Sequence, residues 1–107
     1  MNLAIPESDI ARADKLITAE AVRDVLIDMV NIRSPTGGEL PMAEYMVVRM
    51  RKAGLDAELQ FVSEGRPNAV GHVRGSGDGL NLLFTGHMDT SYDGTEEDLV
   101  GDGFKPR

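Results

Sequence analysis

A short apolar run at residues 82–84 is the feature that most constrains the fold of this chain. The run, Leu-Leu-Phe, stands between Gly79 and Gly86, and no charged residue interrupts that interval. A short apolar run bounded by glycines is typical of a β-strand that is buried on both faces. Such a strand needs a covering layer on each side, so the run predicts an α/β fold with helices packed on a sheet.

The residues directly after this run have side chains suited to metal binding. His87 and Asp89 are two positions apart, so on an extended backbone both side chains lie on the same side of the chain. A histidine that binds a metal through one ring nitrogen commonly donates its other N–H to a carboxylate. The pattern therefore predicts a metal ligand, His87, and an orienting carboxylate, Asp89. A purely structural His–Asp pair is the alternative that these two residues alone leave open.

Two amphipathic helices are predicted before the strands. Thr18 can cap the first helix, and apolar residues then recur at a spacing of three and four as far as Asn31. The second helix is predicted to begin near Glu39 and to stop at Gly54. Its methionines are predicted to pack in the core rather than to bind a metal. Residues 1–17 have weak periodicity and are predicted to form a loosely ordered arm with one helical turn.

Three strands are predicted after the helices. Residues 55–62 alternate apolar and polar side chains, which is the period of a half-buried strand, and residues 69–74 follow a turn at 64–68. The glycine-rich segment 75–79 lacks the Lys-Ser/Thr ending of a phosphate-binding loop, so it is predicted to be a plain connection. With the run at 82–84, the predicted order is two helices and then three strands.

Composition narrows the class of protein. The chain has 107 residues, 41% of them hydrophobic, and a formal net charge of −7, which fits one small acidic globular domain. No basic stripe is present, which argues against nucleic-acid binding. The absence of cysteine excludes disulfides and thiolate metal sites. The first ten residues resemble neither a signal peptide nor a membrane anchor, so a cytoplasmic location is expected.

The segment after the histidine motif is rich in carboxylates. Calcium and magnesium prefer oxygen ligands, but the acidic spacing here does not follow an EF-hand loop, so a solvated loop is predicted. Residues 105–107 add no capped element, which predicts that the chain ends within a longer domain. The acidic residues are Asp93, Glu96, Glu97, Asp98 and Asp102.

Several motifs together resemble one enzyme family. Residues 82–90 (LLFTGHMDT) are similar to the first metal-ligand motif of the acetylornithine deacetylase, succinyl-diaminopimelate desuccinylase, aminoacylase and carboxypeptidase G family of zinc-dependent hydrolases. Residues 34–39 (SPTGGE), 53–55 (AGL) and 66–68 (RPN) resemble the amino-terminal region of the same family in order and spacing. The resemblance covers roughly residues 18–94.

The resemblance implies a function for two residues. His87 matches the ligand of one of two adjacent metal ions, zinc with cobalt or manganese as options, and Asp89 matches the catalytic carboxylate that orients it. In such sites the paired metals bind a shared water and polarise an amide carbonyl, while a glutamate acts as general base. The implied substrates are small N-acyl amino acids or peptides. The implied fold is the α/β/α catalytic domain of the zinc-exopeptidase type, commonly with a later domain that forms a homodimer.

The sequence also departs from this family. The remaining metal ligands and the general base lie downstream of the motif in the relatives, and His72 matches none of them, so it is predicted to be an ordinary strand residue. Many relatives have Val-Pro-like residues where this chain has Ser91 and Tyr92. Residues 18–107 are therefore predicted to be a partial catalytic domain that is inactive alone and is completed by a missing carboxy-terminal segment or a second chain.

Two alternatives come from other functional classes. The chain could be a non-catalytic interaction module, or a decayed fragment of such an enzyme, and an uncovered apolar helix face would favour this interpretation. A small nucleotide-binding domain is the weaker option, because no strand leads through a glycine fingerprint into a helix.

Overall fold

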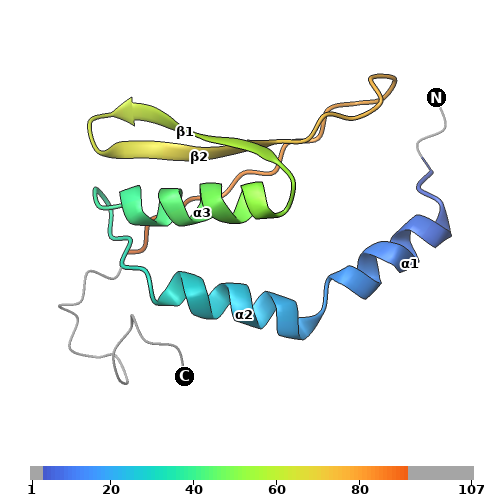
Figure 1. The fold of residues 1–107 in the computed structure, drawn as a ribbon, viewed down its shortest axis with the longest axis horizontal. Helices are drawn as coiled ribbons and strands as arrows, with labels where there is room; N and C mark the ends of the chain where they lie inside the picture. The colour runs from blue at the N-terminus through green and yellow to red at the C-terminus, as the bar shows by residue number, and fades with distance from the viewer. Residues whose placement is uncertain (1–3, 92–107) are drawn as a thin grey trace.

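A computed structural model describes residues 4–91 of the chain. Three helices come first, α1 (Glu7–Leu16), α2 (Ala19–Val30) and α3 (Leu40–Lys52). Two strands follow, β1 (Asp56–Ser63) and β2 (Arg66–His72), and form an antiparallel hairpin (Figure 1). The described part is therefore mixed α/β, as predicted, but it has three helices and two strands instead of two helices and three strands.

Local sequence signals set the bounds of α2 and α3, and both helix predictions are confirmed. The Thr18 hydroxyl caps α2 by accepting a hydrogen bond of 3.1 Å from the amide of Ala21. This helix ends at Val30, and the amide of the following residue, Asn31, donates to the carbonyl of Ile27. After α3 the chain turns at Gly54, where φ is +88°, a conformation that favours glycine.

The hairpin matches the prediction closely for β1 and less closely for β2. The strands pair in a register that places Leu59 opposite Ala69, and a tight turn at Gly65 has φ of +71°. Residues 66–68 were predicted to belong to the turn but lie in β2. These residues pair with the end of β1. Pro67 lacks an amide hydrogen, but it is tolerated there because β2 is an outer strand.

One face of the hairpin packs against α3 and forms a small core. Among residues 4–91, the buried hydrophobic side chains are Met42, Ala43 and Val47 of α3 and Ala57 of β1. The methionine of α3 at position 42 thus packs in the core as predicted. Gly71 of β2 allows this close approach, because a Cβ there would lie 2.5 Å from the Sδ of Met50.

The predicted third strand is absent from the described residues. Residues 82–84 belong to no helix or strand, and the side chains of Leu83 and Phe84 are 85% and 86% exposed. The prediction of a strand buried on both faces is therefore wrong here. An apolar run indicates side chains that tend to be buried, but it forms a strand only when a neighbouring strand supplies its backbone hydrogen bonds. The segment instead runs back past the hairpin toward the loop before α3 (Figure 1).

The first two helices lie outside the small core. The arm predicted for residues 1–17 contains α1, which is longer than the single turn expected and has no buried residue. Although α2 is amphipathic, it also has no buried residue, and Val22 and Leu26 are 55% and 57% exposed. No helix within residues 4–91 is long and apolar enough to cross a membrane.

A matched pair of valines on α3 tests this core. We expect Val47→Ala to lower the free energy of unfolding by about 2 kcal/mol, because two buried methyl groups are lost and a cavity remains. The same substitution at Val48, which is 48% exposed, should change it by less than about 0.5 kcal/mol. Urea unfolding followed by circular dichroism measures both, and equal losses would contradict the placement of the core.

Candidate functional site

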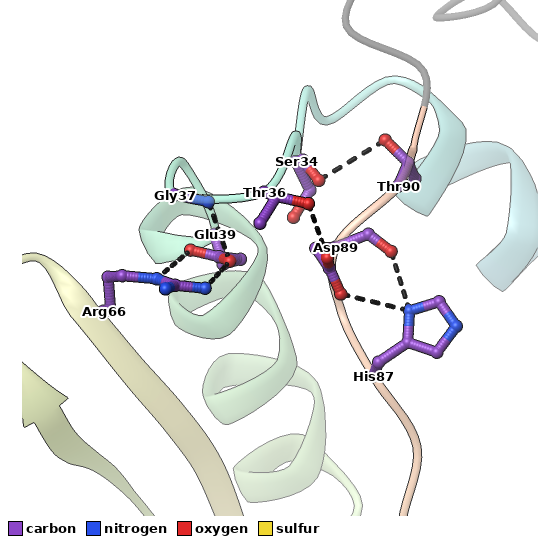
Figure 2. A network of polar contacts seen from close by, with 8 residues as sticks. All are labelled: Ser34, Thr36, Gly37, Glu39, Arg66, His87, Asp89 and Thr90. Atoms are coloured by element: carbon purple, nitrogen blue, oxygen red, sulfur yellow. Dashed lines mark hydrogen bonds and ion pairs between the residues drawn. The ribbon is translucent and has the colours of Figure 1, made fainter.

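Two segments that are far apart in the sequence meet at the candidate site. The loop between α2 and α3 contains Ser34 and Pro35, and the chain after the apolar run returns to it at Thr90. Pro35 and Thr90 form a parallel β-bridge, in which the Thr90 amide donates a hydrogen bond of 2.8 Å to the carbonyl of Ser34. Figure 2 shows His87 and Asp89 beside this junction. The bridge therefore fixes the backbone next to the predicted metal ligand.

Asp89 engages one ring nitrogen of His87. The Nδ1 atom of His87 lies 2.7 Å from the backbone carbonyl oxygen of Asp89 and 3.2 Å from its carboxylate Oδ1. Both partners are acceptors in the ionised state of Asp89, so the neutral imidazole satisfies them only when its proton is on Nδ1. The His87 side chain is otherwise 85% exposed. Its Nε2 lone pair is consequently available to an external ligand.

Thr36 holds the other carboxylate oxygen of Asp89. The Thr36 hydroxyl donates a hydrogen bond of 2.7 Å to Oδ2 (Figure 2). This hydrogen bond is the main cause that lowers the pKa of Asp89 below its usual range, with a smaller contribution from His87. Asp89 therefore stays ionised at neutral pH and keeps both oxygens as acceptors.

An ion pair between Glu39 and Arg66 lies beside this network. The Glu39 side chain is only 8% exposed, and the guanidinium of Arg66 contacts both of its oxygens, with Nε 3.1 Å from Oε2. The amide of Gly37 donates a further hydrogen bond of 2.9 Å to Oε1. The Arg66 hydrogen bonds, and then that of Gly37, lower the pKa of Glu39 to about 2. The same pairing raises the pKa of Arg66.

The side chains of Glu39, Arg66, His87 and Asp89 line a shallow pocket. Its volume is about 300 Å³, and its wall is formed by the end of β1, the start of β2 and residues 86–89. The polar side chains that line it include Glu39, Arg66, Asn68, His87 and Asp89. His87 thus stands at the edge of a space that a small polar molecule could enter.

The described residues contain no complete set of metal ligands. No group of three or more His, Cys, Asp or Glu side chains suited to a metal gathers within residues 4–91. A working zinc hydrolase site normally has three protein ligands. The donor chemistry fits His87 as one ligand through Nε2, with Asp89 as its orienting partner and not as a second ligand. His72 lies at the last position of β2, and the predicted acidic loop at residues 93–102 lies outside the described residues.

From sequence, Glu39 is predicted only to begin the second helix, and no functional role is predicted for Thr36 or Arg66, although all three lie in segments that carry the family resemblance. The contact between Glu39 and Arg66 joins residues 27 positions apart, and that between Thr36 and Asp89 joins residues 53 apart. No local periodicity reveals contacts of this length. The available signal is the presence of a carboxylate at Glu39 and an arginine at Arg66 in two of the motifs that carry the family resemblance.

Comparison with known proteins adds no assignment. No family model matches the chain, and no solved structure matches it either.

Proposed function

We propose that this chain supplies one ligand and its orienting carboxylate to a dinuclear metal-dependent hydrolase of amide bonds. His87 would bind one metal ion, zinc or alternatively cobalt or manganese, and Asp89 would orient it. The remaining ligands would come from polypeptide outside the described residues or from a second chain. The substrate class is a small N-acyl amino acid or a peptide, as the family resemblance of residues 82–90 implies.

The contact of His87 Nδ1 with Asp89 carries this proposal. The distances of 2.7 Å to the carbonyl and 3.2 Å to the carboxylate direct Nε2 away from the protein. This is the arrangement that a metal-binding histidine uses, because the carboxylate fixes the tautomer and increases the basicity of the free nitrogen.

The residues of the chain would act mainly by positioning. Asp89 holds the proton on Nδ1, so that Nε2 remains a lone-pair donor through the reaction. The adjoining pocket, which is lined by Arg66 and Asn68, places polar groups near the ligand. A bound divalent metal would supply Lewis-acid polarisation of the scissile carbonyl.

The proposal is tested by measuring amine release from N-acetyl and N-succinyl amino acids and from dipeptides, with Zn²⁺ or Co²⁺ present. We expect no turnover by the 107-residue chain, because one protein ligand cannot hold a catalytic metal firmly. Turnover should appear once a polypeptide carrying the remaining ligands is coexpressed. Fast turnover by the chain alone would contradict the proposal that its metal site is incomplete. A completed protein that is inactive with every metal would contradict the proposed hydrolase function.

The uncovered apolar surface favours a second candidate, a non-catalytic module that binds another copy of itself. No residue of α2 is buried, and Val22 and Leu26 are 55% and 57% exposed. The α2 face forms an apolar groove of about 420 Å³ that includes Val22, Val25 and Leu26. An uncovered apolar helix face of this kind is suited to pack against another copy of the chain.

The two candidate functions predict different coding sequences after Arg107 and different oligomeric states of the isolated chain. An in-frame continuation past Arg107 into a Gly-x-x-Asp-like ligand motif would support the enzyme. A genuine stop codon there, together with a concentration-dependent dimer of the isolated chain in sedimentation equilibrium, would support the module.

A further inference from the structure

We infer that Thr36 is a positioning residue whose hydroxyl fixes the Asp89 carboxylate against Nδ1 of His87. The inference deepens the proposed function and rests on it for its consequence, which is a more tightly held ligand. The geometric part, the control of the His87 ring by Thr36, can be tested without any metal.

The two oxygens of the Asp89 carboxylate have separate partners. Oδ2 accepts the hydrogen bond of 2.7 Å from Thr36, and Oδ1 lies 3.2 Å from Nδ1 of His87. The Asp89 side chain is 34% exposed, so without the first contact it can rotate toward water. Loss of the Thr36 hydroxyl would then leave the His87 ring with the backbone carbonyl of Asp89 as its acceptor. The ring would be held less firmly in one tautomer and one orientation.

Thr36 is itself held from the other side of the site. Its neighbour Gly37 donates to Glu39, and Glu39 is gripped through both oxygens by Arg66 of β2. A bidentate arginine–carboxylate pair fixes orientation as well as distance. The Pro35–Thr90 bridge ties the same loop to the segment that carries Asp89. The sheet therefore sets the position of the Thr36 hydroxyl through the loop, and the hydroxyl in turn sets the carboxylate.

The test measures the tautomer of His87 by ¹⁵N NMR of the metal-free, full 107-residue chain at a pH where the imidazole is neutral. We expect the wild-type ring to carry its proton mainly on Nδ1. Thr36→Val removes the hydroxyl with little change of shape and should lower the Nδ1–H population measurably, while the backbone carbonyl of Asp89, 2.7 Å from Nδ1, continues to favour that tautomer. Thr36→Ser keeps a hydroxyl and should restore it. Thr85→Val, the same substitution at an exposed position of the nearby segment, is the matched control.

A merely structural role would not produce this pattern. An Nδ1–H population that is unchanged in Thr36→Val, or lowered equally in Thr85→Val, would overturn the inference, and so would a failure of Thr36→Ser to restore it. Arg66→Lys, which loses the bidentate grip, should give a smaller change in the same direction. Zn²⁺ titration of the same samples is read separately: about tenfold weaker binding at His87 in Thr36→Val is expected. A tautomer that responds in a protein whose His87 binds no metal would sustain the inference and overturn the proposed function.

Discussion

Under the proposed function, His87→Ala removes the metal ligand, and the completed protein is expected to lose at least about 100-fold in kcat/KM. Removal of groups that only orient a ligand commonly costs 10- to 100-fold, and removal of the ligand itself should cost more. In the isolated chain, the NMR changes that Zn²⁺ induces near residue 87 should disappear. Chelator competition in the completed protein measures the change in affinity.

Two further variants distinguish loss of the metal ligand from a non-specific effect of removing a histidine. Asp89→Asn keeps the shape of the side chain, but an amide N–H facing Nδ1 would favour the opposite tautomer and put the ring proton on Nε2. We therefore expect a loss of about 10- to 100-fold in metal affinity. His72→Ala removes the other histidine of the chain and should change neither quantity. Equal losses in His72→Ala and His87→Ala would contradict the assignment of the ligand.

The helices and the hairpin could be predicted from sequence because their signals are local. A capping threonine at position 18 and a glycine at position 54 mark where helices begin and end, and the alternation of residues 55–62 marks β1. The spacing of His87 and Asp89 likewise predicted that the two side chains would be near each other. Each of these signals acts over a few residues of chain, where geometry leaves few choices.

The absence of a strand at residues 82–84 and the presence of the anchoring network could not be predicted in the same way. Residues 82–84 have the composition of a buried strand, yet nothing in the described part of the chain pairs with or covers them. Pairing is a property of two segments, so one segment cannot reveal it. The network of Thr36, Glu39 and Arg66 depends on the loop before α3 meeting β2 and the returning chain. That meeting is a consequence of the tertiary fold.

Acid is expected to destabilise this protein largely through Glu39. The arginine contact lowers the pKa of Glu39 from 4.5 to about 2, so the folded state holds this carboxylate ionised where the unfolded state protonates it. Its contribution to stability is therefore complete above about pH 5 and declines as the pH falls toward 2. Urea midpoints of wild type and Glu39→Gln should differ clearly at about pH 6. That difference should shrink to less than half at about pH 3.

Two comparisons make this pH dependence specific. Glu44→Gln changes an exposed carboxylate in α3, the helix that directly follows Glu39, and its effect on the midpoint should be small at both pH values. Some acid sensitivity should remain in Glu39→Gln, because the hydrogen bond from Thr36 also lowers the pKa of Asp89. The double variant Glu39→Gln/Thr36→Val should therefore have a flatter profile than either single variant. A Glu39→Gln profile parallel to that of wild type from about pH 6 to about pH 3 would mean that Arg66 does not hold Glu39 in the folded protein. The loop that positions Thr36 would then lack its anchor on β2.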